Sequence, residues 1–230
     1  MTDIRTVLAD CPLLTGFPPQ GLNELAAIAR VRHFDRDELI YDKGASVSTL
    51  NVIASGVVRI SSINSAGREA TLIMFSAKTW FGDAVFSPGM KRVYGATAHE
   101  ATTLVEIPGD AFRAVMQTYP QCYPVVVDMI SRRLWAAISI IEDDALRSVS
   151  ARIGRRLLFL AQIQGDTDVG AQPITLRITR EHIANIMGMT RQGVHKWIKD
   201  FEQRGLIALT YGQIELTNPA ALHHYLQTLD

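Results

Sequence analysis

The sequence contains few cysteines and no long apolar run. Its two cysteines, Cys11 and Cys122, lie far apart among 230 residues and form neither a CxxC pair nor a zinc-binding spacing. An iron–sulfur cluster needs about four cysteine ligands, so two distant ones argue against such a cofactor. No run approaches the roughly 20 apolar residues of a membrane helix, and the first residues lack the basic region and apolar core of a secretory signal. We therefore expect a cytoplasmic protein with no membrane partner.

The sequence also lacks the short motifs of common catalytic sites. It has no Gly-rich phosphate loop, no HExxH, no GxSxG and no paired Cys/His set. The acidic residues 142–144 are predicted to form a solvated hinge between domains, not a catalytic cluster. We therefore expect no enzymatic activity, no catalytic residue and no metal site.

Neither sign of charge dominates, because 23 basic and 23 acidic residues give a net charge of zero. The two parts of the chain differ, however. Residues 1–146 carry 13 basic and 16 acidic side chains, whereas residues 147–230 carry 10 basic and 7 acidic ones. A basic bias in the second part suits binding to phosphates.

The most informative segment runs from Thr179 to Leu209 and predicts two short helices joined by a tight turn. Gly188 can end the first helix in the left-handed conformation, and Thr190 can cap the second. The second helix has apolar residues at helical spacing, namely Val194, Trp197, Ile198 and Phe201. Between them lie side chains that donate to bases or phosphates, namely Arg191, Gln192, His195 and Lys196. An ordinary helical hairpin is the alternative, but the agreement of turn, apolar pattern and polar face favours a DNA-binding helix-turn-helix.

Two short runs typical of β-strands follow this motif. Residues 206–210 and 213–216 flank Tyr211-Gly212, and a glycine at this position predicts a tight hairpin. Such a hairpin would be the wing of a winged helix-turn-helix.

The first part of the chain predicts a different architecture. Residues 1–30 show a helical apolar pattern, and residues 31–108 contain short runs of β-branched and aromatic residues separated by turn residues. Strands at this spacing indicate an antiparallel jelly roll. The fold class is therefore expected to be α+β, with an N-terminal jelly roll and a C-terminal winged helix-turn-helix.

A long helix is predicted from Val125 to about Asp143. Its apolar residues recur at steps of three and four, close to a coiled-coil seam, and comprise Val126, Ile130, Leu134, Ala137, Ile141 and Ala145. A helix packed on its own barrel is the alternative. We expect a dimer interface, since helix-turn-helix proteins commonly read two half-sites as dimers. The expected domains are residues 1–124 (effector sensing), 125–145 (dimerisation helix and hinge) and 146–230 (DNA binding).

This order of parts resembles the CRP/FNR family of bacterial transcription regulators. Members have a cyclic-nucleotide-binding-type jelly roll, a long dimerisation helix and a winged helix-turn-helix. Five passages carry the resemblance over nearly the whole chain: residues 13–17 (LLTGF), 51–59 (NVIASGVVR), 67–70 (GREA), 81–83 (FGD) and 178–184 (ITREHIA). The resemblance implies a homodimer that regulates transcription from a palindromic operator, with double-stranded DNA and RNA polymerase as partners.

Carried over position by position, the family's base-reading residues fall on Arg191, Gln192 and Lys196, with His195 beside them. The cAMP-receptor branch has Glu at the middle position, which accepts from cytosine N4, whereas Gln pairs with adenine N6 and N7. We therefore expect a half-site altered at that base pair. Three further residues are expected to contact phosphates and to position the helix: Thr179, Arg180 and Thr190.

The resemblance also implies an effector pocket in the N-terminal domain. Its candidate residues are Gly82, Asp83, Arg92, Val93, Leu134, Ala137 and Ile138. In cAMP-binding members a Gly-Glu pair meets the ribose, an Arg-Ser pair the phosphate and a Thr-Ser pair the base. Here the acid is shorter and the hydroxyls are replaced by apolar groups. A buried nucleotide would leave polar atoms unpaired, so the pattern argues against cAMP.

The identity of any effector stays open. Arg92 either pairs with a phosphate or is a solvated loop residue. Haem would need an axial ligand, for which His33 and His99 are the candidates. A cyclic dinucleotide, an apolar small molecule or no ligand are further alternatives. A cyclic-nucleotide or haem-responsive sensor module whose output is not transcription is the alternative function, and the helix-turn-helix argues against it.

Overall fold

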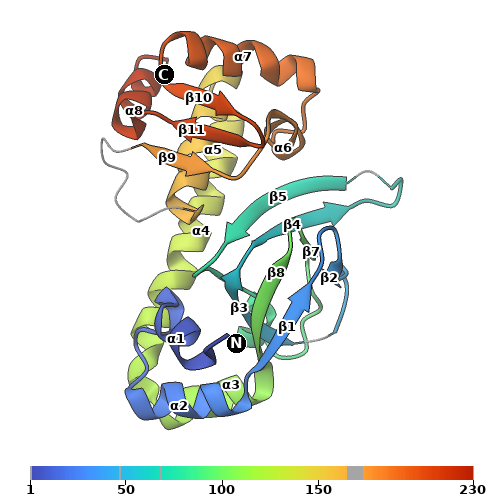
Figure 1. Ribbon diagram of the computed structural model, residues 1–230, viewed down its shortest axis with the longest axis vertical. Helices are drawn as coiled ribbons and strands as arrows, with labels where there is room; N and C mark the ends of the chain where they lie inside the picture. The colour runs from blue at the N-terminus through green and yellow to red at the C-terminus, as the bar shows by residue number, and fades with distance from the viewer. Residues whose placement is uncertain (1, 47, 68, 165–172, 230) are drawn as a thin grey trace. The chain divides into compact units, whose positions relative to one another are not determined.

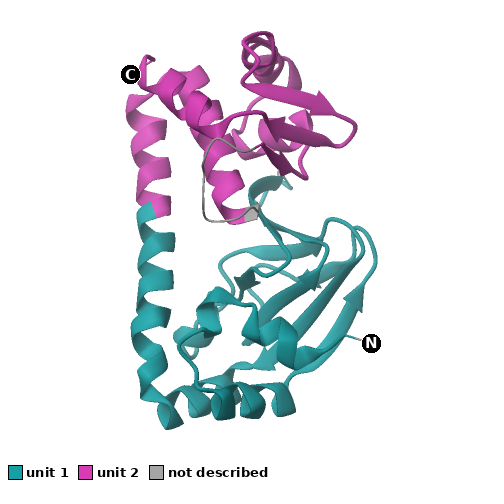
Figure 2. Ribbon diagram, turned by 60° about the vertical axis from the view of Figure 1, so that its left-hand side comes forward, with its two compact units in different colours: residues 1–135 teal, residues 136–230 magenta. Residues whose placement is uncertain are grey.

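The computed structural model describes residues 2–46, 48–67, 69–164 and 173–229. The chain forms two compact units, residues 1–135 and 136–230, and the division falls inside helix α4 (Figure 2). Each unit has its own core. One residue of the passages that carry the family resemblance, Arg68, lies outside the described residues.

The first unit is built on two four-stranded antiparallel sheets (Figure 1). One has the order β1-β8-β3-β6 and the other β2-β7-β4-β5. The strands are β1 (Arg30–Phe34), β2 (Leu39–Tyr41), β3 (Thr49–Ser55), β4 (Val57–Ile63), β5 (Glu69–Ser76), β6 (Trp80–Phe81), β7 (Gly95–Ala98) and β8 (Thr102–Pro108). β4 and β5 form the longest hairpin, paired from Val57↔Ser76 to Ile63↔Glu69. The predicted jelly roll is confirmed.

Helices pack against the sheet that contains β3 and β8. They are α1 (Ile4–Ala9), α2 (Pro19–Ile28) and α3 (Gly109–Thr118), with the 3-10 turns η1 (Pro12–Leu14), η2 (Asp83–Phe86) and η3 (Pro120–Cys122). Each helix buries one apolar stripe, and Phe112 of α3 meets Phe86 edge-on at 5.9 Å between ring centroids. Cys11 and Cys122 are buried in the same core as free thiols. Burial raises the pKa of Cys11 to about 12, which keeps the thiol protonated and unreactive.

Helix α4 (Tyr123–Leu146) is longer than predicted at both ends. Residues 142–144, predicted to form a solvated hinge, are helical, and Glu142 and Asp144 are exposed. The Asp143 carboxylate lies 3.9 Å from the Arg147 guanidinium and 3.6 Å from that of Arg155. These cations offset the repulsion between an acidic side chain and the C-terminal end of a helix dipole. The bend follows at 147–148, where Ser148 Oγ accepts from the first turn of α5.

The apolar seam predicted on α4 is corrected at one residue. Val126 is only 3% exposed and belongs to the core of the first unit, so it is not available to a partner helix. Its neighbour Val127 is 59% exposed instead. Further along α4, the exposed large apolar residues are Ile130, Leu134, Trp135, Ile138, Ile141 and Leu146.

The second unit contains α5 (Val149–Gln164), β9 (Ile174–Leu176), α6 (Arg180–Ile186), α7 (Arg191–Gln203), β10 (Ile207–Thr210), β11 (Gln213–Leu216) and α8 (Pro219–Gln227). Its antiparallel sheet has the order β10-β11-β9, and α5, α7 and α8 enclose the core (Figure 1). Phe201 of α7 is fully buried there. β10 and β11 form the predicted wing, with Tyr211-Gly212 at its tip.

Candidate nucleic-acid interface

The geometry of the helix-turn-helix is set by its turn and its caps. Gly188 has φ +62°, the left-handed conformation that ends α6. Thr190 Oγ1 accepts from the Gly193 amide at 3.1 Å and begins α7. At the start of α6, Thr179 Oγ1 accepts from the His182 amide at 3.3 Å, and the Thr179 amide donates to His182 Nδ1 at 3.0 Å. This is a capping box with His in place of the usual Glu or Gln. The caps define where both helices begin.

Helix α7 has a buried face and an exposed one. Val194, Ile198 and Phe201 are fully buried in the second unit. Four side chains outside this buried face are exposed: the predicted base-reading residues Arg191, Gln192 and Lys196, and His195 beside them. The structure therefore brings the predicted residues together on one accessible helix face.

Three of these side chains contact neighbours within the second unit. The Arg191 guanidinium donates to the Glu181 carboxylate of α6. Arg180 Nη1 lies 3.2 Å from His195 Nδ1, and Lys196 Nζ lies 4.8 Å from the ring centroid of Trp197. Sequence reasoning missed Glu181, because its contact with Arg191 joins two helices across a turn and no spacing rule signals it.

The hydroxyls of the predicted phosphate contacts Thr179 and Thr190 already accept bonds as helix caps. A threonine hydroxyl that accepts from an amide keeps its own O–H to donate. A phosphate is therefore compatible with both caps.

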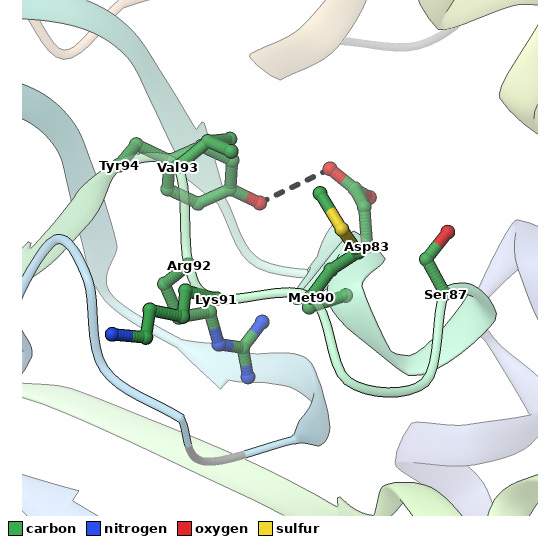
Figure 3. A pocket seen from close by; sticks show the side chains of 8 residues that line it. Asp83, Ser87, Met90, Lys91, Arg92, Val93 and Tyr94 are labelled. Carbon is green, nitrogen blue, oxygen red and sulfur yellow. Dashed lines mark hydrogen bonds between the residues drawn. The ribbon is translucent and has the colours of Figure 1, made fainter.

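In the first unit, the Asp83 carboxylate of the candidate effector pocket is engaged by the protein itself. Its Oδ1 accepts from Arg133 Nη1 at 2.6 Å. Its Oδ2 accepts from the Tyr94 hydroxyl at 3.0 Å, the bond drawn as a dashed line in Figure 3. Arg133 also donates to the backbone carbonyl of Trp80 at 2.5 Å, and its guanidinium lies 3.4 Å from the centroid of the Trp80 ring. Burial raises the pKa of Tyr94 to about 12, so its phenol stays protonated as the donor. Sequence reasoning missed Arg133 and Tyr94.

The interpretation of Arg92 as a solvated loop residue is wrong. Its side chain is buried, with only 3% of the residue exposed. Nη2 donates to the Thr49 carbonyl at 2.8 Å, and the guanidinium lies 4.4 Å from the ring centroid of Tyr41. Val93, by contrast, is exposed and carries no hydroxyl. Arg92 thus ties its loop to β3 from within the protein.

Two hollows lie beside Asp83. One, of about 180 Å³, is lined by Asp83, Ala84, Ser87, Met90, Lys91, Arg92, Val93 and Tyr94 (Figure 3). The other, of about 410 Å³, is lined by Asp83, Phe86, Ser87, Ile130, Arg133 and Leu134. Two other candidate residues of the effector pocket, Ala137 and Ile138, line neither hollow and are exposed residues of the second unit.

Neither candidate haem ligand lines these hollows. His33 is exposed on β1, with Nδ1 3.0 Å from Thr103 Oγ1. His99 is half-buried, and burial lowers its pKa. Within the described ranges, no cluster of three or more His, Cys, Asp or Glu side chains is arranged to hold a metal ion. Nor does any helix in that part of the chain have the length and apolarity to cross a membrane.

Gly82 makes a close backbone approach that a side chain would prevent. It has φ +110°, and a Cβ there would lie 2.2 Å from the Thr49 carbonyl oxygen. We expect Gly82→Ala to lower the free energy of unfolding by about 2–4 kcal/mol, because strain and overpacking add. Gly89→Ala is the matched control, since φ is +84° there but nothing lies within 4 Å. Urea unfolding of both variants measures the difference, and equal losses would contradict the clash.

Comparison with known proteins matches both parts of the chain. Residues 31–119 match the cyclic nucleotide-binding domain, and residues 151–225 match the Crp-like helix-turn-helix domain. A CRP-like cAMP-activated global transcriptional regulator of Mycobacterium tuberculosis is 29% identical over 204 residues, which is 88% of this chain and 91% of that protein. The global nitrogen regulator of Synechococcus elongatus is 26% identical over 212 residues, covering 91% and 95%.

Solved structures share the fold. FixK2 from Bradyrhizobium japonicum superposes with a TM-score of 0.72 at 19% identity, covering 88% of this chain and 98% of that one. A CRP/FNR-family transcriptional regulator from Thermus thermophilus gives 0.64 at 23% identity, covering 87% and 100%.

A jelly roll of the cyclic-nucleotide-binding type and a winged helix-turn-helix with an exposed polar face on its second helix define a DNA-binding transcription regulator. Both domains are matched along this chain in that order, and the M. tuberculosis relative aligned to it is named as a CRP-like transcriptional regulator. The chain belongs to the CRP/FNR family.

Proposed function

We propose that this regulator acts in the bacterial cytoplasm as a homodimer that reads a two-fold symmetric operator through α7. The observation that carries the proposal is the exposed face of α7. Arg191 can donate with both arms of its fork to guanine O6 and N7, and Gln192 can pair with adenine N6 and N7. Lys196 and His195 extend the same face, while Thr179, Arg180 and Thr190 contact phosphates and fix the register.

The exposed apolar face of α4 supports the dimer. Ile130, Leu134 and Ile141 are 38%, 58% and 68% exposed at steps of four and seven residues. Such a stripe costs free energy in water and is stabilised by a second copy of the same helix. In this proposal residues 1–124 sense an effector, residues 125–145 dimerise, and residues 146–230 bind DNA, with RNA polymerase as the partner in regulation.

In vitro selection of DNA bound by the purified protein, with no ligand added, tests this proposal. We expect enrichment of a two-fold symmetric site. Recovery of a single, asymmetric site would contradict the dimer. Failure to enrich any site, without ligand and again with cAMP, cyclic di-GMP and haem, would contradict sequence-specific binding.

For the effector, the M. tuberculosis relative is named as cAMP-activated, and we infer that this chain departs from it. Asp83 is paired with Arg133, Arg92 is bonded to Thr49, and Val93 brings no hydroxyl for a phosphate. A bound nucleotide would have to break these bonds without replacing all of them. We expect cAMP at millimolar concentration to change the affinity for the selected site by less than about two-fold. Fluorescence anisotropy measures this, and a ten-fold increase would contradict the inference.

A further inference from the structure

We infer that Glu181 is a positioning residue that sets sequence discrimination at the base pair read by Arg191. The inference rests on the proposed function of α7. Glu181 lies in the first turn of α6, Arg191 is the first residue of α7, and the carboxylate accepts from the guanidinium. Both side chains are on the surface, 51% and 71% exposed, and in the proposed function Arg191 faces the DNA.

Arg180, the residue before Glu181, also contacts a side chain of α7. Arg180 Nη1 lies 3.2 Å from His195 Nδ1, so two adjacent residues of α6 each contact a side chain on the exposed face of α7. Thr179 and Thr190 cap the two helices, and Ile183 is fully buried in the core they share. The backbone positions from which Glu181 and Arg191 project are therefore fixed before DNA binds.

The chemistry of the pair explains its effect on specificity. A guanidinium has five N–H donors, so Arg191 can keep one bond to Glu181 and direct others at a guanine edge. Without the carboxylate, a long flexible arginine can instead swing to the nearest phosphate, which every DNA sequence offers. Glu181 also carries negative charge at a surface that approaches phosphates. When Glu181 is present, its bond to Arg191 and its negative charge both weaken binding to random DNA. They weaken binding to the guanine that Arg191 reads by less.

We therefore expect Glu181→Gln to tighten binding to random DNA. Discrimination between the selected operator and its variant at the Arg191 base pair should fall by roughly two- to five-fold, the scale of an exposed ion pair. On random DNA the logarithmic salt dependence should steepen by about one unit per protomer, because one phosphate contact is gained.

Glu202→Gln is the matched control. It makes the same change near the other end of α7, where Glu202 pairs with Lys199 at 2.8 Å, and it should leave discrimination at this base pair unchanged. In the Arg191→Ala background, Glu181→Gln should no longer change discrimination. Lysine at this position keeps the charge but loses the fork. In the Arg191→Lys background, Glu181→Gln should therefore change discrimination less than it does in the wild-type protein.

The measurement is fluorescence anisotropy with the full chain on three duplexes: the selected operator, its single-base-pair variant and random DNA. An unchanged discrimination ratio in Glu181→Gln, or an equal change in Glu202→Gln, would overturn the inference. A wild-type protein that selects no site would refute the proposed function instead, so the two failures are distinguishable. Thermal melting of each variant shows that it is folded.

Discussion

Arg191→Ala is expected to weaken binding to the selected operator by about 5- to 150-fold, which corresponds to about 1–3 kcal/mol. The reason is that a bidentate arginine–guanine contact is lost, and alanine offers no donor in its place. Binding to random DNA should fall much less, since in the proposed complex Arg191 contacts a base edge and not a phosphate. Anisotropy on both duplexes measures the two losses.

The control for this prediction removes a positive charge from elsewhere on α7. Lys199 is exposed and pairs with Glu202, and Lys199→Ala should weaken both duplexes by similar, small factors. If Arg191→Ala instead weakened operator and random DNA equally, Arg191 would be a phosphate contact and not a base-reading residue.

Ile141→Glu is expected to abolish dimerisation and to weaken operator binding by at least about 100-fold. Ile141 is 68% exposed on α4, and a symmetric interface would bury two new carboxylates without partners. A monomer holds only one recognition helix, so it loses the affinity that comes from binding both half-sites together. Sedimentation equilibrium and anisotropy measure the two effects.

Ser139→Glu provides the matched control for the helix itself. Ser139 is exposed on α4 and lies about 200° around the helix from Ile141, away from the seam. The same new charge there should leave the protein dimeric. A monomeric Ser139→Glu, or a dimeric Ile141→Glu, would contradict the proposed seam.

Much of the fold follows from local sequence signals. Gly188 and Thr190 specify a turn and a cap through their own backbone chemistry, and the alternation of buried and polar residues in α7 identifies both faces. The winged hairpin follows from Tyr211-Gly212 between two β-prone runs. These features are predictable because each depends on residues close together in the chain.

The errors and omissions depend on contacts between distant residues. Val126 has the spacing of a seam residue, but the adjacent core of the first unit buries it. Residues 142–144 have the composition of a hinge, yet the arginines that follow stabilise them as helix. Arg92 is followed by an exposed valine, and only the approach of Thr49 and Tyr41 explains its burial. The pattern of apolar and polar residues within one segment does not predict contacts with residues that are distant in the sequence.

The candidate site divides in the same way. Arg191, Gln192, His195 and Lys196 share a face because they lie within one helix, and the sequence predicts that directly. The partner of Arg191 comes from another helix, and the partners of Asp83 come from α4 and from the residue that precedes β7. Such partners become visible only when the chain is folded.

In the proposed complex, a dimer places two copies of α7 in successive major grooves on one side of the DNA. The most direct test inserts half a helical turn, about five base pairs, between the half-sites of the selected operator. We expect this insertion to abolish specific binding, and we expect insertion of a full turn to be better tolerated. Undiminished binding to the half-turn duplex would contradict the claim, because each half-site would then be read independently.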